Sequence, residues 1–405
     1  GHLNSVADTP ELRAAYNENL PRITEFYTRL GADERLYAKY KALNEAQTHA
    51  ANSPKLTPPR QRALDNALRG FVLGGAELQG EAKSRFAAIQ EEQAAKSQAF
   101  SEHVMDATDA FAHYASEADL DGVPVDVISA AKAAAEAEGK DGCKLTLHMP
   151  SYLPVMQYAN NRALRETMYR AYVTRASEFG PVEKDNSPLM RDIVALRQEE
   201  SALLGYDSFA QVSLVPKMAD TPEQVMSFLL DLAKRAKPFA EQDMAELRTF
   251  AMDECGLTNL QAWDVPYVSE KLKEARYAFS DQEVKQYFTE PTVLKGLFGL
   301  IETLFDVSVK PDQAPVWHET VRFFRIERAG QLIGQFYLDP YARPGKRPGA
   351  WMDDVRGRWN RPDNRGAQTP VAHLVCNYAK GVGDKPALLT HDDVTTLFQI
   401  GRAHV

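Results

Sequence analysis

Residue types that could do chemistry are sparse in this sequence. His318-Glu319 begins like the motif His-Glu-x-x-His, in which two imidazoles one helical turn apart bind zinc and the glutamate acts as a base. Position 322 is Arg, however, and the segment runs into a β-like stretch. Because the motif needs its second histidine on a helix, these residues are not expected to bind a metal.

Two adjacent aspartate pairs, Asp353-Asp354 and Asp392-Asp393, could supply carboxylates. Neighbouring residues point to different sides of a strand or a helix, so the members of a pair are poorly placed to share one metal ion or one proton. We therefore expect both pairs to serve in helix capping or to be solvated.

His373 lies within a predicted strand near residues 370–378. Alternation places it on one face with three neighbours, Val371, Val375 and Asn377. A hydrogen-bonded structural histidine is the favoured interpretation, and contact with a ligand in a cleft is the alternative. Cys376 points to the other face and is expected to be a small core residue.

Trp351 follows a loop rich in Gly, Pro and Arg at residues 344–349. The sequence leaves open whether this ring contacts a ligand or packs against the helical body. Gly345 and Gly349 do not form a phosphate loop, because no Gly-Lys-Ser/Thr follows them into a helix. No Gly-x-Ser-x-Gly nucleophile motif occurs either, so the residues present make no complete active site.

The last helix signal in the chain comes at residues 390–398. Thr390 can act as an N-cap, and Asp393 lies where a carboxylate meets exposed N–H groups. Val394, Leu397 and Phe398 then recur at helical spacing, after which the apolar pattern stops. Since short helices are marginal, this stretch is interpreted as an element that has been cut short.

The elements that would position these residues are mainly helical. Expected helices cover residues 9–44 (kinked at Pro21, with a stop at Gly31), 60–71, 80–116, 130–138, 155–177, 189–204 and 221–250 (kinked or interrupted at Pro238), with two more from Asp281 and Pro291. Expected strands are residues 143–148, 321–327, 332–341 and 370–378, the middle two forming a hairpin across Ala329-Gly330. The prediction is a mainly α fold with one small sheet just before the last helix.

Composition narrows the class of protein. The chain has 405 residues, 44% of them hydrophobic and 25% charged, which favours a globular protein of two domains. A net charge of −9 gives no support to nucleic-acid binding, and no apolar run is long enough for a membrane span. The three cysteines, Cys143, Cys255 and Cys376, have no metal-type spacing, so we expect a reducing compartment, the cytoplasm.

Several strings resemble the thimet-oligopeptidase family of zinc metallopeptidases, most closely its bacterial members. They are residues 2–6 (HLNSV), 63–69 (ALDNALR), 150–156 (PSYLPVM), 168–172 (MYRAY), 174–177 (TRAS), 336–339 (FYLD), 349–354 (GAWMDD) and 397–398 (LF). The resemblance implies a helical ellipsoid divided by a deep channel, with a small sheet near the zinc site at the channel floor. It implies hydrolysis of short peptides by a zinc-activated water, with a glutamate as general base.

In that family, Leu397-Phe398 would be followed by His-Glu-Phe-Gly-His, whereas Gln399 stands here. The resemblance therefore implies a partial fold, shortened at both ends. Residues 1–148 would be an incomplete N-terminal domain, 149–398 the first part of the catalytic domain, and 399–405 a non-native tail. The tail's Gln-Ile-Gly-Arg-Ala-His-Val is what a common sequencing adapter encodes when one C precedes it.

The expectations for this chain follow from that shortening. It is predicted to be inactive, with no catalytic or metal-binding residues and no bound zinc, although the complete enzyme would use zinc. Its partners would be short peptides, with no nucleic acid or membrane, and the complete enzyme would be monomeric. Residues expected to line a substrate cleft are Gly349, Ala350, Trp351, Met352, His373 and Tyr378. The alternative is a non-catalytic helical module that binds peptides or regulates a partner.

Overall fold

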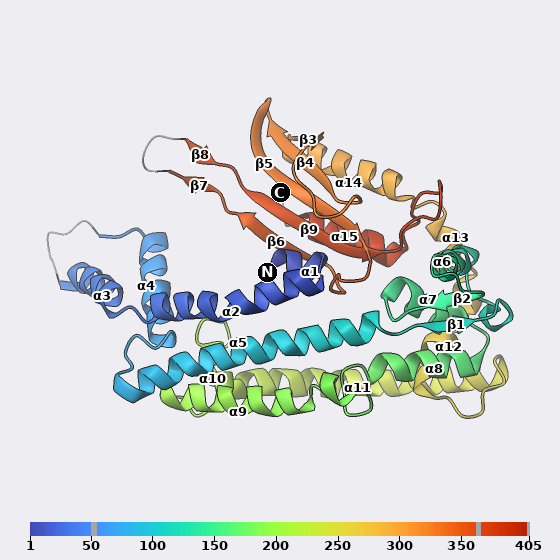
Figure 1. Cartoon of the computed structure of the whole chain (residues 1–405), viewed down its shortest axis with the longest axis horizontal. Helices are drawn as coiled ribbons and strands as arrows, with labels where there is room; N and C mark the ends of the chain where they lie inside the picture. Colours follow the sequence, from blue (N-terminus) through green and yellow to red (C-terminus); the bar gives the residue numbers. More distant parts are fainter. Residues whose placement is uncertain (50–54, 362–365, 403–405) are drawn as a thin grey trace. The chain divides into compact units, whose positions relative to one another are not determined.

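The computed structural model describes residues 1–49, 55–361 and 366–402 (Figure 1). The chain forms two compact units that are interleaved in sequence. The first comprises residues 1–9, 105–175 and 244–405, and the second comprises 10–104 and 176–243. Among the described residues, no helix is both long enough and apolar enough to cross a membrane.

The second unit is built from helices. They are α2 (Pro10–Gly31), α3 (Glu34–His49), α4 (Pro58–Leu73), α5 (Gly80–Asp109), η2 (Val182–Lys184), α9 (Ser187–Leu203), α10 (Phe209–Leu214) and α11 (Pro222–Asp253). The last residues of α5 and of α11 belong to the first unit. Helix α2 ends at Gly31, which confirms the stop expected there. Pro238 lies inside α11, as Pro21 lies inside α2, so Pro238 does not interrupt its helix.

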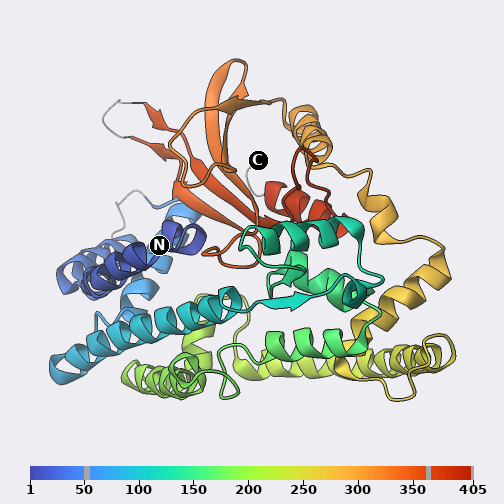
Figure 2. The ribbon, with the colours of Figure 1, turned by 45° about the vertical axis from the view of Figure 1, so that its right-hand side comes forward.

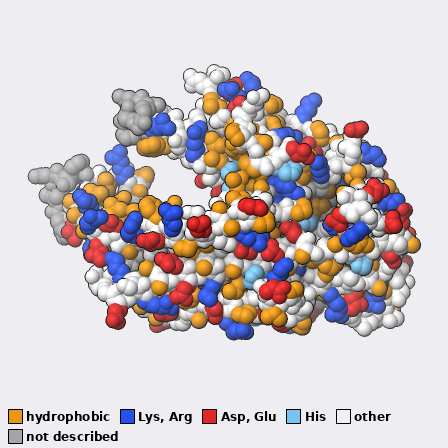
Figure 3. Space-filling model, in the orientation of Figure 1, with side chains coloured by type: hydrophobic (Ala, Val, Ile, Leu, Met, Phe, Trp, Pro, Cys, Tyr) orange, Lys and Arg blue, Asp and Glu red, His pale blue; other side chains and the backbone are white. Residues whose placement is uncertain are grey.

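Large apolar side chains lie exposed on this unit. Figure 3 shows hydrophobic side chains on the surface over α2 to α4, where Phe26 and Tyr27 are 51% and 65% exposed. On α11, Phe228 and Leu232 lie on one apolar stripe, and both are more than half exposed. The periodicity therefore predicted the helix correctly, but these side chains do not enter a core in this chain.

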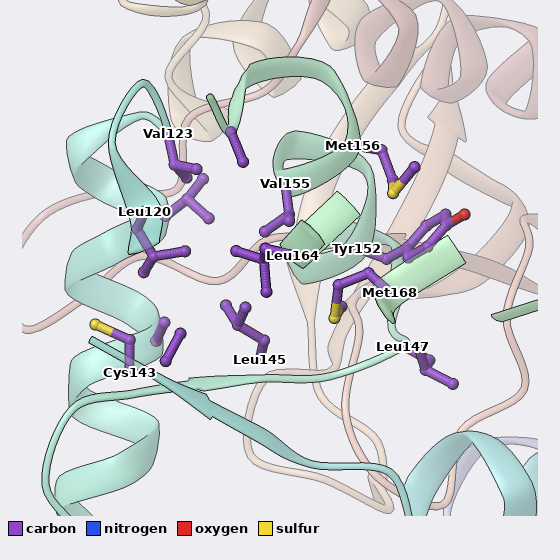
Figure 4. Packing of buried hydrophobic residues seen from close by; sticks show 14 residues of the cluster. Leu120, Val123, Cys143, Leu145, Leu147, Tyr152, Val155, Met156, Leu164 and Met168 are labelled. Atoms are coloured by element: carbon purple, nitrogen blue, oxygen red, sulfur yellow. The ribbon is translucent and has the colours of Figure 1, made fainter. Parts of the chain in front are cut away.

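The first unit contains a helical part with its own core. Its elements are β1 (His113–Ala115), η1 (Ala118–Leu120), α6 (Val125–Glu136), β2 (Cys143–Leu145), α7 (Met149–Tyr158), α8 (Arg162–Val173), η3 (Ala262–Asp264), α12 (Val265–Tyr277) and α13 (Asp281–Lys285). Figure 4 shows Met156, Leu164 and Met168 among the side chains of this core.

Two expected element boundaries in this region are wrong. The helix expected at residues 80–116 ends at Asp109, because His113–Ala115 pair antiparallel with Cys143–Leu145. The helix expected at 155–177 is two helices, α7 and α8. Asn161 separates them and caps α8 by accepting a hydrogen bond from Leu164 N. The side-chain cap and the strand pairing outweigh a continuous helical pattern.

The first unit also contains the sheet on which the candidate site lies (Figures 1 and 2). Its strands are β3 (Ser308–Asp312), β4 (Arg322–Arg328), β5 (Gln331–Tyr341), β6 (Trp351–Arg356) and β9 (Val371–Tyr378), in the order β3-β4-β5-β9-β6. A separate pair is formed by β7 (Trp359–Asn360) and β8 (Ala367–Gln368). The β4–β5 hairpin turns through Ala329 and Gly330, both at positive φ. That hairpin and β9 confirm predictions, whereas β3 and β6 were missed.

Helices cover one face of this sheet. Even-numbered side chains of β4, β5 and β9, among them Phe324, Phe336 and Leu374, form a core with α14 (Glu290–Phe305) and α15 (His391–Arg402). Cys376 belongs to this core and is fully buried, as predicted. The opposite face carries the odd-numbered side chains, and α1 (His2–Val6) lies against it at β9.

Asp339 connects the face of the sheet opposite α14 and α15 to helix α1 at the start of the chain. Its carboxylate is fully buried and accepts hydrogen bonds from Arg343 Nη1 and Nη2 at 2.7 Å, Lys346 Nζ at 2.8 Å and Trp317 Nε1 at 2.9 Å. Burial alone would raise the pKa of Asp339, but the hydrogen bonds and the two cations outweigh it and hold the pKa below its usual value. Arg343 also donates to Val6 O at 2.6 Å, which fixes the end of α1.

Backbone contacts extend this attachment along the loop before β6. Asp8 N donates to Gly345 O, and Arg347 N donates to Ser5 O, each at 2.9 Å. Gly345 has φ +71°, and a Cβ there would lie 2.7 Å from Asp8 O. Only glycine fits this close approach, which holds α1 and the loop together.

Helix α15 begins as predicted and ends later than expected. Thr390 Oγ1 accepts from Asp393 N at 3.1 Å, and Asp393 Oδ2 accepts from Thr390 N at 2.9 Å, a reciprocal cap. Burial raises the pKa of Asp393. The apolar pattern does not stop at Phe398, because the helix runs to Arg402 and Ile400 packs on the core. That residues 399–405 are a non-native tail stays a prediction, and 403–405 lie outside the described residues.

Replacing Asp339 tests whether its carboxylate holds α1 and the loop before β6 in place. Asp339→Asn should lower the free energy of unfolding by about 3 to 5 kcal/mol, because Lys346 and Arg343 would remain buried without their counter-ion. Urea unfolding followed by circular dichroism measures this. The control is Glu319→Gln, which removes a 78%-exposed partner of Lys380 and should cost under about 1 kcal/mol. Equal losses in the two variants would contradict the assigned role.

Removing the N-cap of α15 tests the local prediction. Thr390→Ala should lower the free energy of unfolding by about 1 kcal/mol, because the N–H of Asp393 loses its acceptor. Thr395→Ala, at an exposed position within the same helix, should change it by less than about 0.5 kcal/mol. Urea titrations of both variants give the comparison, and a smaller loss at Thr390 than at Thr395 would refute the cap.

Candidate functional site

The uncovered face of the sheet brings three potential metal ligands together. Asp353 on β6 is the cross-strand partner of His373 on β9, and His2 at the start of α1 stacks on His373. One donor atom from each side chain lies within 4.8 Å of the other two. Among the residues that the structure describes, this is the one group of His, Cys, Asp and Glu compact enough to hold a metal ion.

The two imidazoles are parallel and poorly solvated. Their ring centroids are 3.4 Å apart at an interplanar angle of 8°. His373 is 8% exposed, and its Nδ1 is buried with no hydrogen-bond partner in the described part of the chain; the same holds for both ring nitrogens of His2. The favoured interpretation of His373 as a hydrogen-bonded structural residue is therefore wrong for Nδ1.

Burial determines the charge state of this pair. The pKa of His2 is lowered to about 4, mainly by burial and also by the neighbouring His373, while Asp353 and Asp339 act in the opposite direction. Burial also lowers the pKa of His373, and this effect outweighs the opposite effect of Asp353 and Asp339. Both rings are therefore neutral at neutral pH, and each keeps one nitrogen lone pair for an acceptor role.

Aromatic rings enclose the two histidines. Trp317 meets His2 edge-on at 4.5 Å between centroids and His373 at 5.4 Å, and Tyr337 lies 5.4 Å from His373. The hydrogen bond from Trp317 Nε1 to Asp339 fixes the indole in this position. The two imidazoles are thus flanked by the aromatic rings of Trp317 and Tyr337, and Asp353 beside them is exposed.

The structure brings together only some of the residues expected to line a substrate cleft. Trp351 faces the same side of the sheet as His373, and Met352 the opposite side, with 39% of its surface exposed. Gly349 and Ala350 are exposed, and Asn377 Nδ2 donates to Gly349 O at 2.6 Å. Tyr378 lies in the helix-covered core and donates its hydroxyl proton to Asp393 O, so it is not grouped with His373.

The remaining candidates have structural partners. His318 lies outside any helix, with its Nδ1 2.8 Å from Thr320 Oγ1, so the incomplete zinc motif is not formed, as predicted. Asp393 caps α15, which confirms the capping interpretation for that pair. For the other pair the solvated interpretation is incomplete, because Asp353 joins the two histidines while Asp354 points to the opposite face.

Sequence reasoning missed His2, Trp317, Tyr337 and Asp339 as neighbours of His373. His2 and Asp339 both fall in strings quoted for the family resemblance, which was the available signal. Nothing local to those strings indicates that residues 2 and 373 meet, because the contact depends on how α1 is fixed to the loop before β6.

The zinc motif implied by the resemblance has no counterpart in these residues. No His-Glu-x-x-His occurs in the 405 residues. In α15, Ile400 packs on the core, and a Cβ at Gly401 would lie 3.3 Å from Leu297. This turn of α15 therefore carries Gln399 and apolar residues in place of zinc ligands. The side chains present in the chain do not provide for zinc-dependent hydrolysis.

Comparisons with known proteins agree on one family. Residues 155–403 match the model described as Peptidase family M3, and residues 1–83 match the N-terminal domain of neurolysin and thimet oligopeptidase. The chain is similar to oligopeptidase A of Salmonella typhimurium and of Escherichia coli, each 46% identical over 402 residues. It is also 39% identical over 413 residues to a probable cytosolic oligopeptidase A of Arabidopsis thaliana.

Each of these alignments covers 98% of this chain and 58% of the relative's length. The family model for the peptidase domain matches more than half of the chain and includes β5, β9 and α15. The resemblance noted in the short strings thus extends along nearly the whole sequence. The chain belongs to peptidase family M3.

Proposed function

We propose that the complete protein is a zinc-dependent oligopeptidase that hydrolyses short peptides. The observation that carries this proposal is the 46% identity to two bacterial proteins named oligopeptidase A, spread over 98% of the chain. The three cysteines are all free thiols, which supports the reducing cytoplasm as its compartment. We further propose that the complete enzyme acts as a monomer.

Within that enzyme, the residues present here would supply scaffold and substrate contacts. We propose residues 1–148 as part of the N-terminal oligopeptidase domain and 149–398 as the first part of the catalytic domain. The family matches at residues 1–83 and 155–403 support this division. Because these 405 residues contain no His-Glu-x-x-His, the chain by itself should not hydrolyse peptides.

The proposed peptide contact is the edge strand β6. This strand ends the order β3-β4-β5-β9-β6, so its outer edge can pair with an extended peptide through main-chain hydrogen bonds. Main-chain pairing does not encode side chains, which suits broad specificity. Gly349, Ala350, Trp351 and Met352 stand at the start of this edge, and His373 is beside them on β9.

The position of these residues is supported by a hydrogen-bonded loop. Asn377 donates from one amide group to Arg347 O at 2.9 Å and to Gly349 O at 2.6 Å, and Gly345 N donates to Asp109 Oδ2 at 2.9 Å. Because these hydrogen bonds order the loop before β6, less entropy is lost when a peptide binds to this edge.

A non-catalytic helical module is the alternative. Such a module should bury its apolar faces, yet Phe228, Leu232 and Phe239, which lie along one stripe of α11, are 52% to 68% exposed. Large exposed apolar patches are typical of surfaces that another segment or partner covers. The exposed stripe therefore favours a scaffold that is part of a larger protein.

The peptidase proposal predicts different behaviour for two forms of the protein. The complete protein should cleave an internally quenched short peptide, lose activity with a chelator and regain it with added zinc. The 405-residue chain should show no turnover in the same assay, because the zinc motif is not among its residues. Oligopeptidase A of Escherichia coli serves as the positive control.

Two outcomes would contradict this proposal. Chelator-sensitive cleavage by the 405-residue chain alone would show that its own side chains are sufficient for metal-dependent peptide hydrolysis. A complete protein that leaves peptides intact in the presence of zinc would remove the peptidase assignment.

The edge-strand contact predicts a defined affinity loss. Trp351→Ala should weaken binding of a fluorescent unfolded peptide to the 405-residue chain about tenfold, since an aromatic contact contributes on the order of 1.5 kcal/mol. Trp359→Ala removes another indole, 51% exposed on β7, and should leave the affinity unchanged. Fluorescence anisotropy measures both. An equal loss in the two variants, or no loss in either, would exclude Trp351 as a contact.

A further inference from the structure

We propose that His2, Asp353 and His373 form a binding site for one divalent transition-metal ion of the zinc class. This site is separate from the peptidase chemistry proposed above and does not depend on it. Two imidazoles and one carboxylate are a donor set that zinc accepts, with a fourth position left for water. The ligands come from α1, β6 and β9, so the ion would join the start of the chain to the sheet.

The first support is the distance between donors. One donor atom of each residue lies within 4.8 Å of the other two. Tetrahedral coordination at 2.0–2.1 Å requires donors about 3.3 Å apart. The side chains must therefore close by about 1.5 Å or less, which rotation about side-chain bonds can supply without moving the strands.

The second support is the unsatisfied nitrogen of a buried ligand. His373 is more than nine-tenths buried, and its Nδ1 has no hydrogen-bond partner in the described residues, nor does either ring nitrogen of His2. A buried polar atom without a partner is unfavourable. A metal ion accepts the lone pair of such a nitrogen and removes this cost.

The stacked rings indicate how the site would fill. With ring centroids 3.4 Å apart and ring planes only 8° from parallel, the in-plane lone pairs of the two imidazoles cannot point at one ion. One ring must turn, and we assign that movement to His2, because it is less buried than His373 and lies in the five-residue helix α1. Metal binding would therefore separate the two stacked rings. This movement would change the environment of the neighbouring Trp317.

The surrounding charges restrict the donor set to these three residues. Asp339 lies on the same face, but its oxygens are already bonded to Arg343, Lys346 and Trp317. Asp354 follows Asp353 on β6 and pairs in register with Ala372, so it points to the other face. That difference makes Asp354 a matched control for Asp353.

The experiment is a titration of the purified 405-residue chain with Co²⁺ and Zn²⁺. We expect one equivalent of Co²⁺ to bind with the visible absorption of a tetrahedral site, to be displaced by Zn²⁺, and to alter tryptophan fluorescence. Asp353→Asn and His373→Gln should each weaken Co²⁺ binding at least about tenfold. Asp354→Asn should retain the parent affinity, and circular dichroism checks that every variant is folded.

Three results would overturn the proposal. The first is no saturable Co²⁺ binding by the folded chain. The second is equal affinity in the parent chain and in Asp353→Asn. The third is loss of binding in His2→Gln alone, which would assign the ion to chelation by the terminal amine and the adjacent imidazole. Since none of these measurements uses peptide cleavage, failure of the peptidase proposal would leave them unaffected.

Discussion

The buried carboxylate of Asp339 is the interaction on which the sheet's uncovered face depends. It sits on β5, accepts from Arg343, Lys346 and Trp317, and through Arg343 reaches the backbone of Val6. Because an unpaired buried charge is costly, none of these partners can leave without penalty. The indole that encloses the two histidines and the helix that carries His2 are therefore placed by one charged group that takes no direct part in the site.

Features determined by near neighbours in sequence were predictable. The β4–β5 hairpin follows from alternating residues around Ala329-Gly330, and the reciprocal cap of Thr390 and Asp393 follows from their spacing. Features that depend on distant segments were not. Helix α5 ends at Asp109 because β1 pairs with β2. Strand β6 carries aspartates and a tryptophan, has no clear alternation, and is determined by pairing with β9.

The same distinction explains what was found of the candidate site. Alternation along β9 correctly placed His373 on the face opposite Cys376 and Leu374. It could not reveal His2, which lies 371 positions away, or show that Asp353 rather than Asp354 faces His373, since that depends on the strand register. Family strings indicated which segments mattered, and only the folded chain showed which of their side chains meet.

The interleaving of the two compact units has a consequence for synthesis. All residues of the second unit lie between positions 10 and 243, so that unit is synthesised before the sheet of the first unit. The first unit needs residues 1–9 together with the sheet and α15, so its opening segment must wait for almost the whole chain to emerge. Contacts of such high sequence separation form slowly. Until those residues have emerged, residues 1–9 would remain outside their final fold and accessible to chaperones and proteases.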